Sequence, residues 1–223
     1  MSFFFNLKST TTKCINGCVL FNDTSNFSYW ENKKTTSDEE HIVEYLKTNN
    51  LVSGKNIMHI GVGNSYFVKN ISNYNKVDAI TLSKKEMDYG LSFNIRNYNI
   101  FFQNKYSYKN LLNETLKSYD IIVDVNLKSF ACCEEAFYDL FLRYVSMLNP
   151  GGIIITGREG MNWSRLIKPV LSFSFRNFFF KRLKEFDGPI NNCLSEKECT
   201  KISDLFNLSI DTNNPNLVLF KKS

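Results

Sequence analysis

Residues 57 to 71 of the chain have the sequence IMHIGVGNSYFVKNI. A short apolar run leads into two glycines one residue apart, Gly61 and Gly63, and a segment with helical spacing follows. This pattern is typical of a buried strand, a tight turn and a helix. Glycine lets such a turn adopt positive φ and come close to a ligand. In an open α/β sheet, ligands bind where the first strand meets its helix, so we expect a binding site here.

Strands and helices alternate along the rest of the chain. Ser37 and Glu40 have the spacing of a capping box, which predicts a helix start near Ser37. Further strands, apolar on both faces, are expected at 77–83, 99–104, 119–127 and 151–157. The segments LFNLSID and NLVLFKKS, joined by TNNPN, predict a closing antiparallel pair. The sequence therefore predicts an α/β fold with a doubly wound, mostly parallel sheet covered on both faces.

The composition is that of a globular protein. With 223 residues, 43% of them apolar, and 20 Phe and 11 Tyr, we expect one domain with an aromatic-rich interior. The net charge of +5 is scattered, so it permits an anionic partner without requiring one. We find no apolar run of the ~20 residues that span a bilayer and no secretory signal, so we expect a cytoplasmic protein. Its six cysteines are then interpreted as free structural thiols rather than zinc ligands.

The periodicity divides the chain into an N-terminal cap segment, 1–35, and a main domain, 36–223, with an insertion at about 158–203. Tyr29 and Trp30 of the cap segment are expected to form a second wall of the pocket. The aromatic and basic stretch at 168–186 is interpreted as packing on the core or on a partner subunit, which allows a homodimer. A lid over the acceptor, or an interfacial helix, is the alternative.

Two turns of the sequence resemble the class I S-adenosylmethionine-dependent methyltransferase family. Residues 59 to 65, HIGVGNS, are similar to the family's first motif, which is acidic, apolar and G-x-G-x-G. Residues 148 to 152, LNPGG, look like its Leu-Lys-Pro-Gly-Gly turn, and Tyr119-Asp120 like the aromatic-Asp pair that often opens strand four. The dinucleotide motif G-x-G-x-x-G fits less well, because its third glycine is Tyr66. The resemblance covers 37–223 and implies a seven-stranded sheet with an antiparallel last strand.

The resemblance also implies S-adenosylmethionine as cofactor, with departures in its site. His59 replaces the acid of the first motif, and Thr81 replaces the acid that usually binds the ribose hydroxyls. However, ITLSKKE at 80–86 resembles the I-T-L-S-x-x-Q segment of cyclopropane fatty acid synthases, which makes Thr81 and Glu86 the ribose partners. Each of these residues has an alternative interpretation. His59 is then a buried structural histidine, Thr81 an ordinary strand residue, and Glu86 a solvated acid at a helix start. The implied cofactor contacts are His59, Gly61, Gly63, Ser65, Thr81, Leu82, Glu86, Asn104 and Asp124.

Other motifs reduce the number of methyltransferase sub-classes that the sequence fits. The segment after strand four, 124–127, lacks the two prolines of enzymes that methylate exocyclic or amide nitrogens, which argues against a nucleic-acid substrate. Ser129-Phe130 stands where cyclopropane synthases carry Glu-His. Metal-dependent catechol-type enzymes need acids at the ends of strands four and five and an Asn beside the second acid. Asp124 is suitable, but strand five ends in Thr156-Gly157-Arg158-Glu159, so no metal is expected.

The remaining hypothesis is a metal-free methyltransferase with a small-molecule acceptor, oxygen being slightly favoured over nitrogen. A hydroxyl acceptor needs a general base, and Asp124 and Glu159 are the candidates. A helix-capping or solvated acid is the alternative for Asp124. The candidate substrate contacts are Asn126, Arg158, Trp163 and Arg165. Two alternatives stay open: a catalytically inactive nucleotide-binding or interaction module, and an RNA-binding enzyme with a basic, aromatic stripe.

Overall fold

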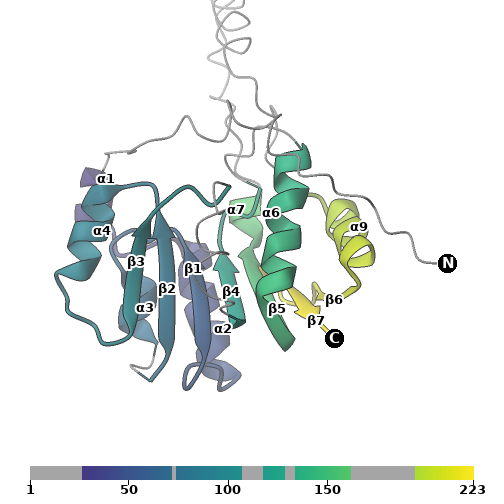
Figure 1. Cartoon of the computed structure of the whole chain (residues 1–223), viewed down its shortest axis with the longest axis horizontal. Coiled ribbons are helices and arrows are strands. Elements are labelled where there is room, and N and C mark those ends of the chain that lie inside the picture. The colour runs from purple at the N-terminus through teal and green to yellow at the C-terminus, as the bar shows by residue number, and fades with distance from the viewer. Residues whose placement is uncertain (1–26, 72–73, 107–117, 129–133, 162–193) are drawn as a thin grey trace, which may run out of the picture.

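Seven strands within the described residues form one sheet, in the order β3-β2-β1-β4-β5-β7-β6 (Figure 1). The structure is a computed structural model of the chain, and it describes residues 27–71, 74–106, 118–128, 134–161 and 194–223. The strands are β1 (Asn56–Ile60), β2 (Lys76–Thr81), β3 (Tyr98–Phe102), β4 (Tyr119–Asp124), β5 (Leu148–Gly157), β6 (Leu208–Asp211) and β7 (Leu217–Lys222).

The sheet confirms the predicted doubly wound topology. Strands β1, β2, β3, β4 and β5 pair in parallel, and β7 lies antiparallel between β5 and β6. The chain moves outward from β1 to β3 and then returns to β4 on the other side of β1. This return makes the carboxyl ends of β1 and β4 the switch point at which ligands of open α/β sheets bind.

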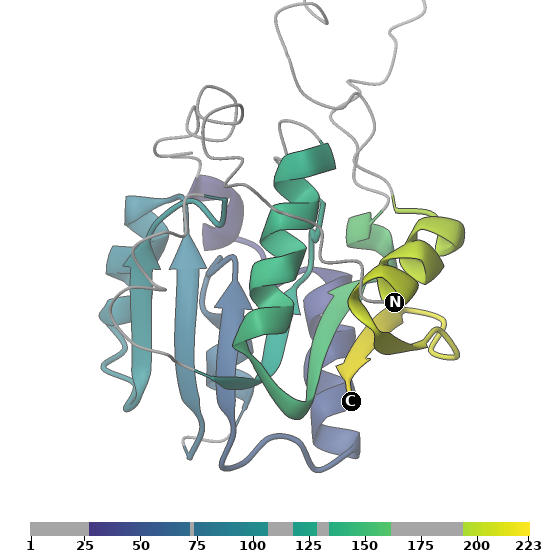
Figure 2. The same cartoon turned by 45° about the vertical axis from the view of Figure 1, so that its right-hand side comes forward.

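Helices cover both faces of the sheet, as Figure 2 shows for α6 in front of the strands and α2 behind them. One core joins α6 and α9 to β4, β5 and β7, with Phe137, Phe141 and Tyr144 at its centre. The other joins α2 and α3 to β1 and β2 around Ile42 and Phe67. The helices are α1 (Ser28–Glu31), α2 (Ser37–Thr48), α3 (Tyr66–Asn70), α4 (Lys84–Leu91), α6 (Glu134–Met147), α7 (Arg158–Met161) and α9 (Glu196–Phe206).

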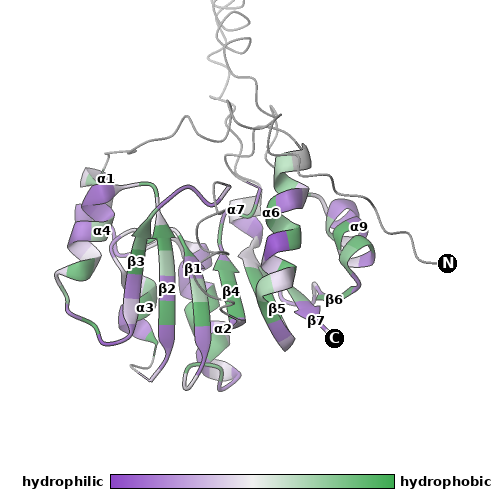
Figure 3. Ribbon diagram, in the orientation of Figure 1, coloured by the Kyte–Doolittle hydropathy of each residue, from purple (hydrophilic) through white to green (hydrophobic). Residues whose placement is uncertain are grey.

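Burial on both faces explains the apolar runs inside the strands, which are green in Figure 3 between hydrophilic positions in purple. β4 is buried at five of its six positions, and β2 is buried from Val77 onward.

α2 begins at Ser37 as predicted, but its cap is Thr36, whose hydroxyl accepts a hydrogen bond from the amide of Glu39, one residue before the predicted Ser37 and Glu40 pair. Two other helix boundaries differ from the sequence predictions. α3 begins at Tyr66 rather than near Asn64, because Ser65 has a left-handed backbone that cannot continue a helix. α4 ends at Leu91 and not near residue 96, since the chain turns through positive φ at Asn94.

Candidate active site

The glycine turn after β1 exposes its backbone at the switch point. Gly61 has φ of 90° and Gly63 has φ of 52°, in a region that side chains with a Cβ rarely adopt. The amide of Gly61 donates to the carbonyl of Ile80 at 2.8 Å, which ties the turn to β2. A Cβ added at Gly61 would meet no atom of the described residues within 4 Å. The turn therefore leaves open space beside its first glycine, as a ligand in close contact with the backbone would need.

Trp30 of α1 covers the second glycine. A Cβ added at Gly63 would lie 3.4 Å from the Trp30 ring. The side-chain amide of Asn64 donates to the carbonyls of Lys33 at 2.6 Å and Lys34 at 2.7 Å. These contacts fix residues 30–34 against the glycine turn, whereas the earlier part of the expected cap segment, 1–26, lies outside the described residues.

A carboxylate from the first turn of α4 lies between the glycine turn and the end of β2. Oε2 of Glu86 accepts hydrogen bonds from the amide of Gly63 at 3.1 Å and from the Thr81 hydroxyl at 2.6 Å. Ser83 caps α4 and holds Glu86 there, because its hydroxyl accepts from the Glu86 amide at 3.3 Å. The structure thus joins Thr81 and Glu86, the two residues expected to replace the ribose-binding acid, and Leu82 lies half-buried after Thr81.

Ser65 lies on the inner side of the glycine turn. It is buried, and its hydroxyl lies 3.5 Å from the hydroxyl of Tyr98 on β3. Burial raises the pKa of Tyr98 well above its ordinary value, which keeps the phenol protonated. A Cβ at Gly90 of α4 would come within 2.8 Å of the Ser65 hydroxyl oxygen, so α4 packs closely beneath the turn.

His59 also lies inside the fold. Its ring is 1% exposed, is stacked on Phe67 with centroids 4.4 Å apart, and has Nε2 3.3 Å from Oε1 of Glu39 on α2. Within the described residues neither ring nitrogen makes a well-aligned hydrogen bond. The other carboxylate oxygen of Glu39 accepts from the Thr35 hydroxyl. This placement is that of a residue that joins β1 to α2.

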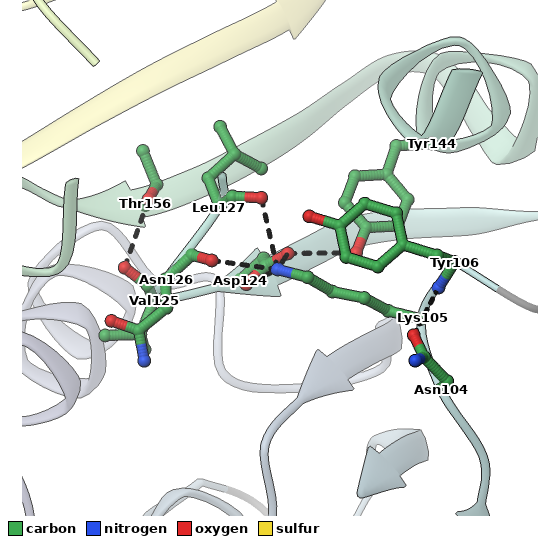
Figure 4. A network of polar contacts seen from close by, with 9 residues as sticks. All are labelled: Asn104, Lys105, Tyr106, Asp124, Val125, Asn126, Leu127, Tyr144 and Thr156. Atoms are coloured by element: carbon green, nitrogen blue, oxygen red, sulfur yellow. Dashed lines mark hydrogen bonds and ion pairs between the residues drawn. The ribbon is translucent and has the colours of Figure 1, made fainter. Parts of the chain in front are cut away.

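Asp124, at the end of β4, is surrounded by donors (Figure 4). The ammonium of Lys105 lies 2.9 Å from Oδ2 and 3.2 Å from Oδ1, and the Tyr144 hydroxyl donates to Oδ2 at 2.9 Å. Asp124 is 1% exposed and Lys105 is 6% exposed. Burial lowers the pKa of Lys105, and the charge of Asp124 opposes that effect. Because Lys105 and Tyr144 enclose this buried carboxylate, an acceptor hydroxyl has little access to it, which argues against Asp124 as the general base.

The turn after β4 carries Asn126, which is exposed at the same edge of the sheet. Its side-chain oxygen would lie 2.9 Å from a Cβ added at Gly160, so the turn and α7 are in close contact. The carboxylate of Glu159, on α7, accepts a hydrogen bond from the Ser37 hydroxyl at the start of α2. The turn that carries Asn126 and the helix that carries Glu159 are therefore in contact beyond the carboxyl ends of β4 and β5.

Two other predicted residues have different surroundings. Oδ1 of Asn104 accepts from the amide of Tyr106 at 2.9 Å, which stabilises the turn that leads to Lys105. The Arg158 guanidinium donates to the carbonyls of Thr212 and Asn214, in the turn between β6 and β7. It therefore has structural partners in this fold, and its expected contact with the acceptor stays a prediction. Trp163, Arg165 and the 168–186 stretch lie outside the described residues.

Three residues near the site were not predicted from the sequence: Lys105, Tyr144 and Glu39. Lys105 lies in a polar segment that gives no local signal of burial. Tyr144 continues the apolar face of α6, and a buried tyrosine there needs a partner for its hydroxyl, which was a usable signal. Among the described residues, no three His, Cys, Asp or Glu side chains gather as a metal site requires, and no described helix could cross a membrane.

Comparison with known proteins finds the same fold in solved structures. No family model and no curated protein sequence matches the chain. The N-methyltransferase NodS from Bradyrhizobium japonicum WM9 aligns with a TM-score of 0.55 at 13% identity, over 85% of this chain and 99% of that one. The magnesium protoporphyrin IX methyltransferase ChlM from Synechocystis PCC 6803, with bound SAM, aligns with a TM-score of 0.56 at 13% identity, over 90% and 93%.

A third structure belongs to an enzyme type that the sequence analysis considered. The cyclopropane synthase MmaA2 from Mycobacterium tuberculosis aligns with a TM-score of 0.51 at 17% identity, over 81% of this chain and 65% of that one. At these identities the likeness establishes a common fold.

Proposed function

We propose, from the class I methyltransferase fold that this chain has, that it transfers a methyl group from S-adenosylmethionine to a small-molecule acceptor without a metal ion. An oxygen acceptor is slightly favoured over nitrogen. The observation that carries the proposal is the pair formed by the open glycine turn and the Glu86 carboxylate. Both lie at the switch point, which is where a ligand of this fold binds.

The residues at this edge fit the adenosine part of the cofactor. The space beside Gly61 lets a ligand approach the backbone closely. The Glu86 carboxylate, fixed by Thr81 and Gly63, has the acceptor capacity to bind two ribose hydroxyls. Asn104 stands after β3, where the resemblance implies an adenine contact.

The acceptor side is formed by the turn after β4 and by α7. When bound, S-adenosylmethionine supplies an electrophilic methyl group, so that positioning of the acceptor carries much of the rate. Glu159 is the better candidate base, because its carboxylate is exposed and within reach of an acceptor, whereas Asp124 is buried and enclosed by Lys105 and Tyr144. In our proposal Asn126 orients the acceptor, and a carboxylate oxygen of Glu159 takes its hydroxyl proton.

Calorimetric titration with S-adenosylmethionine and with S-adenosylhomocysteine tests the proposal. We expect micromolar dissociation constants for the unmodified chain, and binding at least tenfold weaker for Gly61→Val, because the valine side chain fills the ligand's space. Gly54→Val is the matched control, since Gly54 also has positive φ (70°) and open surroundings but lies in the turn before β1. Circular dichroism establishes that both variants are folded.

The outcomes separate the competing functions. Binding that Gly61→Val abolishes and Gly54→Val preserves supports the cofactor site and leads to an acceptor screen that begins with small hydroxylated metabolites. A folded chain that binds neither ligand contradicts the proposal and favours the inactive interaction module.

A further inference from the structure

The ammonium of Lys105 holds together the turn that follows β4. Besides both oxygens of Asp124, it donates to the carbonyl of Asn126 at 2.8 Å and to that of Leu127 at 3.1 Å (Figure 4). An ammonium has three protons, and four acceptor atoms surround this one, so its capacity is fully used. All of the acceptors belong to residues 124–127. A single buried cation thus sets the path of this turn.

Lys105 reaches the turn from the far side of the candidate site. It follows β3, and β2 and β1 lie between β3 and β4 in the sheet. Its chain crosses the carboxyl edge of the sheet, where Figure 1 shows the segment after β3 passing toward β4. The amide of Gln103 donates to the carbonyl of Thr81 at 2.9 Å, which secures the start of this crossing to the end of β2. The Lys105 link therefore fixes the β4 turn relative to the strand ends that carry Thr81 and the glycine turn.

Charge explains why the link needs an ammonium. Asp124 is buried, and a carboxylate without a partner in such a position is strongly destabilising. Tyr144 supplies one hydrogen bond to it but no charge. The two turn carbonyls need donors as well, and an aliphatic side chain would provide none. An aliphatic substitute for Lys105 would remove one donor from four acceptor atoms at one place, and among them Oδ2 of Asp124 would keep its hydrogen bond from Tyr144.

We propose that Lys105 is a positioning residue, whose buried ammonium holds the 124–127 turn in the form that binds the cofactor and presents Asn126 to the acceptor. This inference rests on the proposed function. In this inference Asp124, a candidate base or substrate anchor from the sequence, acts as the counterion that keeps the ammonium in place.

Chemical rescue tests this role. Lys105→Ala removes the atoms of n-propylammonium, so this ion can refill the space and restore the donor. We expect Lys105→Ala to bind S-adenosylmethionine at least tenfold more weakly, and added n-propylammonium to restore most of the affinity. Neutral n-propanol fills similar space with one donor proton and is expected not to restore it. Lys128→Met is the matched control, because Lys128 is equally buried but pairs with Glu198 of α9.

A double variant distinguishes two possible causes of lost affinity, namely the missing donor of the turn and the uncompensated charge of Asp124. Lys105→Met with Asp124→Asn removes both charges and should recover stability in urea, but it leaves the carbonyls of Asn126 and Leu127 without their donor. We therefore expect its cofactor affinity to stay low. Recovery of affinity in the double variant, or equal rescue by n-propanol, would overturn the positioning role.

The unmodified chain distinguishes failure of this inference from failure of the proposed function. If it binds the cofactor and the Lys105 variants bind equally well, the inference is wrong and the function stands. If it binds neither ligand, the function is wrong, and hydrogen exchange still tests the inference. We expect faster amide exchange at 125–128 in Lys105→Met than in Lys128→Met, and equal exchange would contradict the role of Lys105.

Discussion

At the scale of single residues, buried polar side chains near the site lie in pairs that join distant parts of the chain. His59 faces Glu39, and Lys105 faces Asp124. Removal of one partner from a buried ion pair such as Lys105 and Asp124 costs far more than the intact pair contributes, because the other charge stays buried alone. The residue that stands where the family has an acid, His59, thus has a structural partner of its own.

Glu86→Gln tests the proposed ribose contact. The amide keeps one oxygen for Gly63 and Thr81, but its NH₂ group replaces the second acceptor oxygen. A hydrogen bond to a charged group contributes about 1.5–3 kcal/mol, so we expect affinity for S-adenosylmethionine to fall about tenfold or more. Titration calorimetry measures the change, and Glu44→Gln on the exposed side of α2 is the control. Unchanged affinity would show that Glu86 does not bind the cofactor.

A pair of substitutions that swaps the residues at positions 59 and 39 tests the contact between His59 and Glu39. His59→Glu alone places two carboxylates together in the interior, and we expect the free energy of unfolding to fall by about 3 kcal/mol. The double variant His59→Glu with Glu39→His restores the opposite pair and should recover more than half of that loss. Recovery remains partial because Thr35 loses its carboxylate acceptor. Urea unfolding gives the values, and a double variant as unstable as the sum of its single changes would contradict the pairing.

At the scale of elements, the contact between α2 and α7 depends on an acid at a helix start. Oδ2 of Asp38 accepts from the amide of Gly160 at 2.6 Å. A Cβ at Gly157 would lie 2.1 Å from Cγ of Asp38, so glycine is required there for α2 to approach β5. Burial raises the pKa of Asp38, the charge of Glu159 raises it further, and the Gly160 amide opposes them.

The raised pKa of Asp38 predicts a pH-dependent effect of Asp38→Asn. The folded chain binds the Asp38 proton more tightly than the unfolded chain does, so the contribution of Asp38 to stability falls as pH rises from about its ordinary pKa through the raised one. Asparagine cannot ionise and escapes this loss. We expect Asp38→Asn to be more stable, relative to the unmodified chain, at pH 7 than at pH 3.

Urea unfolding at the two pH values measures this difference, with the exposed Asp88→Asn of α4 as control. The same relative stability at both pH values would show that Asp38 is not destabilised by burial in the folded chain.

At the scale of the whole molecule, Arg158 connects the parallel half of the sheet to its closing antiparallel pair. Its amide donates to the carbonyl of Asn216 at 2.9 Å, and its side chain donates to Thr212, Asn214 and Glu196. These contacts join the end of β5, the turn between β6 and β7, and the start of α9. A planar guanidinium can make such divergent contacts, whereas a lysine ammonium cannot.

Arg158→Lys is therefore expected to lower the free energy of unfolding by about 1–3 kcal/mol, because two or more hydrogen bonds from a charged group are lost. The affinity for S-adenosylmethionine should stay unchanged at temperatures where the variant is folded. Thermal unfolding and calorimetry measure the two effects, and the exposed Arg96→Lys is the control. Unchanged stability with a higher KM for the acceptor would support Arg158 as a substrate contact.

The sequence by itself determined the sheet and the position of the glycine turn. Strands buried on both faces must be apolar, and helices that cover them must repeat their apolar residues every three to four positions, so both can be recognised locally. The Gly61 and Gly63 turn was visible for the same reason, since its backbone angles restrict the residue type at those positions. Thr81 and Glu86 were predicted to act together from the resemblance of 80–86 to the I-T-L-S-x-x-Q segment, and a hydrogen bond joins them.

Only the tertiary structure decided which acidic side chains are paired with donors inside the fold. Asp124 meets Lys105 and Tyr144, which lie 19 and 20 residues away, and the Arg158 side chain meets a turn more than 50 residues away. No local pattern encodes such contacts, because they depend on the order in which strands lie side by side. The electrostatic state of a carboxylate depends on its burial and on its neighbours, and both of these are fixed only when the sheet has formed.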